Sequence, residues 1–254
     1  TQIVYPADLE AVGLLHGLLD DADPEMRIAS AHGLGSMGAV NAGAKLRTLA
    51  LQDPDEDVQN AATYALGQLV DHGCTDSLNA LQTVAASSTS TEALIAAIRT
   101  LSAYRPEQHL TYFERGLTHR DDRVRQLAVI GMGRAGDPQM NASLIEMLQD
   151  PSPHVKRLAA HALGQIGSQT SIQTLIGSGR QSSSELRTAI ADALKPFPRE
   201  SVEAALSEAA QARDSATRHI TAYLSGKLGV TRPFSALLVD PDETVRKQAT
   251  LGLA

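Results

Sequence analysis

A segment of 13 residues recurs along this chain. Residues 23–35 read DPEMRIASAHGLG, and residues 152–164 read SPHVKRLAAHALG. We take the first apolar position of each copy as its anchor, and the intervals between successive anchors are 29–35 residues. The anchors are Met26, Val58, Ala93, Val124, Val155, Leu186, Ala216 and Val245. Self-similarity at this period predicts an array of small supersecondary units.

Each copy predicts a second helix that follows a shorter one. The anchor and the residues four and eight positions later fall on one side of a helix, which makes a buried stripe. Asp-Pro pairs such as Asp53-Pro54 and Asp150-Pro151 supply an N-cap and a proline for the first turn. A glycine nine positions after the anchor is expected to end the helix in the left-handed conformation. These glycines are Gly35, Gly67, Gly133 and Gly164.

One helix pair cannot bury its own apolar stripe, so neighbouring pairs must stack. Aromatic residues make up only 3% of the chain and Trp is absent, which suits closely packed helices better than a sheet. We therefore expect an all-α fold, an α-α superhelix (solenoid) of about eight helix-pair repeats.

Acidic and basic residues recur at fixed distances from the anchors. An aspartate stands five residues before the anchor at Asp21, Asp53, Asp150 and Asp240. A base stands one residue after it at Arg27, Arg125, Lys156, Arg187 and Arg246. Two readings are open, a charged binding strip and a ladder that links consecutive repeats. We favour the ladder because both members keep a fixed relation to the core positions.

The pattern Asp-Pro-x-x-x-Val-Arg-x-x-Ala-x-x-Ala-Leu-Gly-x-x-Gly resembles the HEAT repeat, in the short HEAT-like variety named after the phycobilin lyase family. Residues 148–167 match it best, and the resemblance covers nearly the whole chain. It implies one repeat domain over residues 1–254. We expect the chain to continue in a longer parent protein, or one of its ends to pack on a partner. Proteins of this kind include scaffolds, adaptors, chromophore lyases, an iron hydroxylase and DNA glycosylases, so the fold does not fix the function.

Catalytic and metal-binding readings find no support in the residues. The hydroxylase of this superfamily uses His-Glu pairs near the start of the second helix, whereas none of the eight histidines here is followed by Glu. The single cysteine, Cys74, excludes an intramolecular disulfide framework and a multi-cysteine metal site. We expect no enzyme activity, no cofactor and no metal.

The net charge and the hydropathy of the chain limit the classes of partner that it can bind. The net charge of −7 disfavours nucleic-acid binding, which needs a basic footprint. No apolar run reaches the ~20 residues of a membrane span. The first six residues lack the basic and apolar regions of a signal peptide. These features favour a cytoplasmic protein.

A partner is expected on the exposed side of the second helices, which usually line the concave side of such arrays. Positions two and six after the anchor point away from the buried stripe. The candidate partner-binding residues there are His32, Tyr64, Arg99, Arg157, His161, Asp192 and Arg218. Aromatic and basic groups of this kind are typical of a surface that binds a protein or peptide. A solvated face without a ligand is the competing reading for each residue.

A second functional reading follows from the resemblance. A phycobilin-lyase-like protein would bind or transfer a linear tetrapyrrole, and Arg99, Arg157 and Asp192 are the residues that would contribute to such a groove.

Repeats three, six and seven depart from the pattern. Serine-rich stretches at residues 87–91 and 182–184 replace the Asp-Pro turns. These stretches mark either a binding region or relaxed loops, and the sequence alone favours loops.

Overall fold

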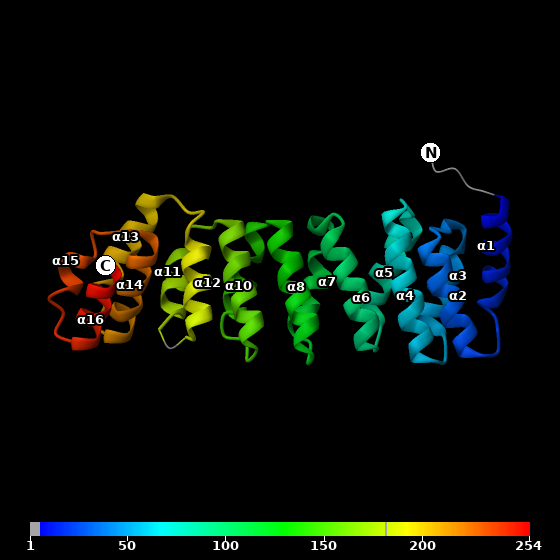
Figure 1. The fold of residues 1–254 in the computed structure, drawn as a ribbon, viewed down its shortest axis with the longest axis horizontal. Helices are drawn as coiled ribbons and strands as arrows, with labels where there is room; N and C mark the ends of the chain where they lie inside the picture. Colours follow the sequence, from blue (N-terminus) through cyan, green and yellow to red (C-terminus); the bar gives the residue numbers. More distant parts are fainter. Residues whose placement is uncertain (1–5, 181) are drawn as a thin grey trace. The chain divides into compact units, whose positions relative to one another are not determined.

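The computed structural model describes the backbone of residues 6–180 and 182–254, and the side chains of residues 9–180 and 182–254. Residues 1–5, within the segment where no signal-peptide pattern was found, lie outside this range. The described chain forms eight consecutive helix pairs (Figure 1). The helices are α1 (Pro6–Leu18), α2 (Pro24–Ser36), α3 (Gly43–Gln52), α4 (Glu56–Asp71), α5 (Thr75–Ser87), α6 (Thr91–Ala103), α7 (Leu110–Leu117), α8 (Asp122–Ala135), α9 (Asn141–Met147), α10 (Pro153–Ile166), α11 (Ser171–Ser178), α12 (Ser184–Leu194), α13 (Arg199–Ala209), α14 (Ser215–Leu228), α15 (Phe234–Leu237) and α16 (Glu243–Leu253).

The chain divides into two compact units, residues 1–131 and residues 132–254, with the boundary inside α8. In the N-terminal unit, α2, α4 and α6 pack side by side, and so do α3, α5 and α7. In the C-terminal unit, α10, α12, α14 and α16 form one layer, and α9, α11 and α13 form another. The predicted all-α class, a solenoid of helix-pair repeats, is confirmed. The single domain over residues 1–254 stays a prediction. No helix of the described residues is long and apolar enough to cross a bilayer.

The predicted buried stripe is present in most repeats. Six anchors are buried, and all eight residues four positions further on are buried as well. Met26 is an exception, because its side chain is 39% exposed in the first turn of α2. The stripe of α2 therefore begins at Ser30, which is buried and donates its hydroxyl to the Met26 carbonyl.

The predicted helix starts were two residues too early. The N-cap of α4 is Asp55, whose carboxylate accepts the Asp57 and Val58 amides. Asp53 instead accepts the Asp55 amide at 2.9 Å and shapes the turn that leads into the helix. In the same way, the Asp150 carboxylate accepts the Ser152 amide at 2.8 Å.

The glycines that were expected to end helices lie inside them, so that prediction was wrong. Gly164 belongs to α10, and the left-handed residue that ends this helix is Gly167, with φ of 70°. A Cβ at Gly164 would stand 2.6 Å from the Ala193 carbonyl oxygen on α12. Gly164 is needed because the two helices touch at this point, and not because the backbone turns there.

The same close contact recurs between other second helices. A Cβ built on Gly35 would stand 2.9 Å from the Cα of Ala65, and one on Gly226 would stand 2.6 Å from the Cα of Gly252. Between α4 and α6 the contact differs. There Gly67 faces Thr100, and a Cβ would meet only the side chain of that threonine.

The predicted charge ladder is confirmed between the first two repeats. Arg27 donates two hydrogen bonds to the Asp53 carboxylate, at 2.8 and 2.9 Å, and both side chains are largely buried. Its guanidinium also donates to the carbonyls of Asp21 and Ala22 in its own repeat. One arginine therefore closes the turn before its own helix and ties it to the next repeat.

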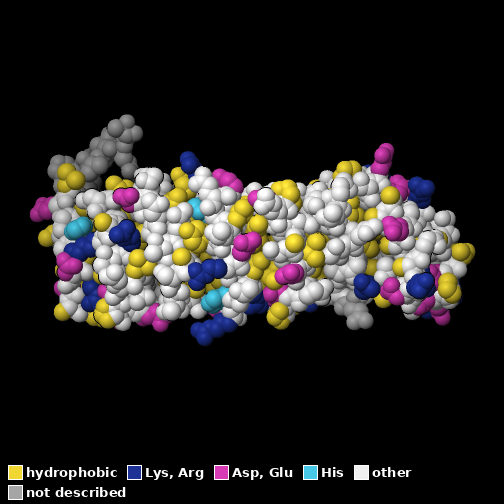
Figure 2. All heavy atoms as spheres, turned by 180° about the vertical axis from the view of Figure 1, so that it is seen from behind, with side chains coloured by type: hydrophobic (Ala, Val, Ile, Leu, Met, Phe, Trp, Pro, Cys, Tyr) yellow, Lys and Arg dark blue, Asp and Glu magenta, His cyan; other side chains and the backbone are white. Residues whose placement is uncertain are grey.

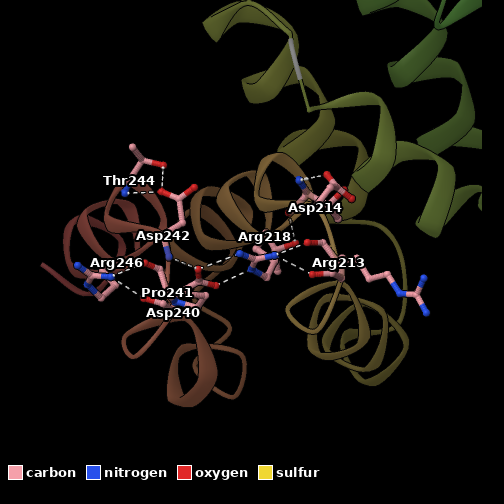
Figure 3. A network of polar contacts seen from close by, with 11 residues as sticks. Arg213, Asp214, Arg218, Asp240, Pro241, Asp242, Thr244 and Arg246 are labelled. Atoms are coloured by element: carbon pink, nitrogen blue, oxygen red, sulfur yellow. Dashed lines mark hydrogen bonds and ion pairs between the residues drawn. The ribbon is translucent and has the colours of Figure 1, made fainter.

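Repeat seven has the same kind of arginine–aspartate pair, but its anchor differs from the predicted one. Arg218 donates to the Asp240 carboxylate at 2.6 and 3.0 Å and to the carbonyls of Ala212 and Arg213 (Figure 3). The cap residue Asp214 accepts the Thr217 amide at 2.8 Å, as Asp55 accepts that of Val58. Thr217 is therefore the anchor of this repeat, one residue later than the predicted Ala216.

The close contact at Gly164 predicts a loss of stability on adding one methyl group. We expect Gly164→Ala to lower the free energy of unfolding by about 1–3 kcal/mol, because the backbone at Ala193 cannot give way freely. Gly177→Ala is the matched control, since a Cβ there makes only an ordinary contact, and it should stabilise α11 by up to about 1 kcal/mol. Urea denaturation measures both, and equal effects of the two substitutions would refute the close-contact role.

The buried ladder pair predicts a dependence on acid. Hydrogen bonding from Arg218 lowers the pKa of Asp240. The ionised Asp240 carboxylate therefore contributes its full stabilisation above pH 3.8, the usual pKa of an aspartate. This contribution is lost as the pH falls through the lowered pKa of Asp240 in the folded protein. Asp240→Asn should cost about 3 kcal/mol at neutral pH because it leaves a largely buried guanidinium without its counter-charge. The exposed Asp192→Asn is the control and should change the free energy by less than about 0.5 kcal/mol. Chemical denaturation at pH 7 and pH 3 tests both variants.

Candidate functional site

Three of the predicted partner-binding residues meet on adjacent helices of the N-terminal unit. His32 on α2, Tyr64 on α4 and Arg99 on α6 all stand six residues after their anchors. The rings of His32 and Tyr64 contact edge to face, with centroids 5.9 Å apart. The Arg99 guanidinium lies over the Tyr64 ring, 5.7 Å from its centroid. Tyr64 is 44% exposed, so this cluster faces solvent.

The cluster borders a hollow of about 400 Å³ across the three helices. Its lining is mostly apolar and includes Ile28 and Ile95, together with the carboxylates of Asp57 and Glu92. A second hollow of about 290 Å³ shares Tyr64, Ala96 and Arg99 with the first. We call the two together the central groove. It is lined by Ile28, His32, Asp57, Asn60, Ala61, Tyr64, Gly67, Gln68, Asp71, Glu92, Ile95, Ala96, Arg99, Thr100, Ala103 and Tyr104.

The local sequence explains why a groove lies here. Thr100 occupies the place that Ala65 takes between α2 and α4, so a branched polar side chain faces Gly67, and both residues line the groove. The arginine–aspartate ladder is also absent at this step, where Gln59 bonds to the Asp53 carbonyl at 2.7 Å. The Ser90 hydroxyl instead donates to the Asn60 side chain at 2.8 Å and links α4 to the start of α6.

Some of the charged side chains around the groove form ion pairs, and others do not. Glu92 pairs with Arg123 at 2.8 Å, and Arg123 also pairs with Asp121 at 2.8 Å. The hydrogen bonds from Arg123 lower the pKa of Asp121 to about 2. Among the described residues, no ion pair involves the side chains of Asp57, Asp71 or Arg99.

The remaining predicted residues lie in the C-terminal unit. Arg157, His161 and Asp192 are exposed. Arg157 contacts the ring of His154 at 3.2 Å, and Asp192 pairs with Lys195 at 2.6 Å on its own helix. Within the described part of this unit, no hydrogen bond, ion pair or ring contact joins the three residues.

The predicted exposure of Arg218 is contradicted by the structure. Its side chain is only 13% exposed and is held by Asp240, so it belongs to the ladder and not to the exposed row. The error follows from the frame of repeat seven, which was set on Ala216. Counting six residues from Thr217 leads instead to Tyr223, whose ring contacts Lys227 at 5.9 Å. Tyr223 was not among the candidate residues for this reason, and Asp57 and Asp71 were not among them because only two positions per repeat were considered.

Metal and nucleic-acid chemistry have little support in the described residues. No group of three His, Cys, Asp or Glu side chains is arranged to hold a metal ion in that part of the chain. On the face that Figure 2 shows, basic and acidic side chains of each unit are interspersed. The groove itself carries three carboxylates and one guanidinium, which does not suit a phosphate backbone.

Comparison with known proteins identifies the repeat. Residues 3–67, 45–126 and 111–195 match the family model of HEAT repeats. The crystal structure of YibA from Escherichia coli is similar over 100% of this chain and 98% of its own, with 17% identity and a TM-score of 0.55. An engineered protein is similar over 96% of this chain and 77% of its own, with 20% identity and a TM-score of 0.54. Both likenesses concern the fold. No curated protein matches the chain by sequence.

The exposure of the cluster predicts that it can be changed without unfolding the chain. Arg99→Glu and Tyr64→Ala should each cost no more than about 1 kcal/mol, the size of an exposed cation–π contact. Leu66→Ala, two residues further along α4 at a fully buried position, should cost about 2–5 kcal/mol. Thermal and urea denaturation compare the three variants. A large loss for Arg99→Glu would show that the cluster supports the fold.

Proposed function

Because the chain belongs to the HEAT-repeat family, we propose that it is a protein-interaction scaffold whose central groove holds a segment of a partner protein. The single observation that carries the proposal is the exposed cluster of His32, Tyr64 and Arg99 in a hollow with a mostly apolar lining. Tyrosine and arginine are the residues on which binding energy concentrates at protein interfaces. A concave site with a mostly apolar lining and a few polar groups also suits a bound side chain.

The departures of repeat three support the same site. The serine-rich turn at residues 87–91 leads into α6, where the Ser90 hydroxyl bonds to Asn60 of the groove, and Thr100 lines the groove itself. We infer that this region is a binding region, although the sequence alone favoured relaxed loops. The scaffold binds rather than catalyses, and we place it in the cytoplasm, as the sequence analysis expected.

The chromophore-binding alternative has weaker support. It relied on Arg99, Arg157 and Asp192, which are divided between the two units. Asp192 already pairs with Lys195, and Arg157 contacts His154. The residues of the central groove favour a peptide, which uses apolar, aromatic and charged contacts together.

Affinity capture from an extract of the source cells tests the proposal. The full chain should retain a partner protein, and the Tyr64→Ala/Arg99→Glu variant should retain at least tenfold less, since each lost hot spot is worth a factor of ten or more. The matched control is Arg47→Glu, which reverses an exposed arginine on α3 outside the groove. It should retain as much as the unmodified chain.

Two outcomes would contradict the proposal. If the folded double variant retains the same proteins as the unmodified chain, the groove is not the binding site. If the chain retains a coloured small molecule and no protein, the chromophore-binding alternative replaces the scaffold.

A further inference from the structure

We infer that the segment bound in the central groove carries an acidic side chain with a basic side chain on either side of it. This inference rests on the proposed function and specifies the partner at the same site. It is drawn from the order of the charges along the groove, which runs from Asp57 through Arg99 to Asp71.

The three charges follow from the geometry of α4. Asp57, Tyr64 and Asp71 are spaced by seven residues, which is 20° short of two full helical turns. They therefore lie on the same face of the helix, and all three line the groove. The guanidinium of Arg99 lies over the middle residue, Tyr64. The groove thus presents a negative, a positive and a negative group in that order.

None of these three groups is neutralised by the described part of the chain. Asp57, Arg99 and Asp71 take part in no ion pair there, although Glu92 at the same edge as Asp57 is paired with Arg123. An unpaired charge in a hollow with a mostly apolar lining gains most from a partner of opposite sign, because water is displaced when the segment binds. A complementary segment is positive, negative and positive in order.

Because the charged groups of the groove are far apart, the order of the charges in the bound segment matters more than its net charge. Seven residues of helix span about 10 Å, and the whole row from Asp57 to Asp71 spans about 21 Å. The Debye length at physiological ionic strength is about 8 Å, so each charge acts mainly on the group placed next to it. A uniformly basic segment would therefore meet one repulsive position, at Arg99, and a uniformly acidic segment would meet two, at Asp57 and Asp71.

The same distances limit the spacing in the partner. An extended or polyproline segment rises about 3.1–3.4 Å per residue, so its charges would be three residues apart. A helical segment would carry them seven residues apart. In both cases an apolar side chain between the first base and the acid would enter the hollow that Ile28 and Ile95 line.

Selection from a display library of random 16-residue peptides on the immobilised full chain tests the inference. Enriched peptides should contain an acidic residue flanked on both sides by Lys or Arg, at a spacing of three or seven. Selection on Arg99→Glu should change the middle residue to Lys or Arg. A peptide selected on the unmodified chain should bind this variant at least tenfold more weakly, and the matching acid-to-lysine change in the peptide should restore its binding. Arg47→Glu should select the same peptides as the unmodified chain.

The outcomes separate this inference from the proposed function. Enriched peptides that need Tyr64 but share no charge order would overturn the inference and leave the groove as a binding site. A lack of any enriched peptide would overturn the inference as well, and the capture experiment would then decide on the scaffold by itself. Loss of capture by the Tyr64→Ala/Arg99→Glu variant together with inverted selection on Arg99→Glu would support both.

Discussion

Close contact between consecutive second helices is the constraint on which the rest of this structure depends. At Gly35, Gly164 and Gly226 a single added methyl group would overlap the backbone of the neighbouring helix. The helices can approach this closely only because small residues face each other, and the approach lets alanine-rich stripes exclude water with few aromatic side chains. The spacing between helices is thus set by individual positions. Where Thr100 takes the place of a small residue, a side chain and not the backbone faces the glycine, and the central groove lies at this contact.

The charged residues divide into those that hold the array and those that do not. Arg27 and Arg218 are each held by two carbonyls of their own repeat and by a carboxylate of the next one, so they are unavailable for a ligand. Such pairs contribute little beyond their desolvation cost, but they fix the register between repeats because a displaced repeat would leave both charges buried and unpaired. Asp57, Arg99 and Asp71 make no ion pair among the described residues, and their charges are free to select a partner.

The fold could be predicted from the sequence because its determinants recur. The buried stripe and the Arg27–Asp53 pair followed from the repeat alone. The errors arose where one residue type has two uses. Glycine is compatible with both a left-handed stop and a close helix contact, and only the structure shows that Gly164 serves the contact and Gly167 the stop. In repeat seven the anchor is the polar residue Thr217, so the apolar Ala216 was taken as the anchor instead. Arg218 was placed on the wrong surface as a result.

The sequence could predict on which side of each helix the candidate site lies, but not all the residues that form it. Helical periodicity places His32, Tyr64 and Arg99 on the exposed side of their helices, and their mutual contacts follow once the repeats stack. It cannot show which groups line the hollow between α4 and α6, since these include the side chain that faces Gly67 across the interface. Packing in a repeat protein constrains mainly the buried positions, which leaves the exposed row free to vary between repeats. Function in such a chain is therefore best sought where the repeat is interrupted, and here the missing ladder step, the Asn60–Ser90 bond and Thr100 coincide at one groove.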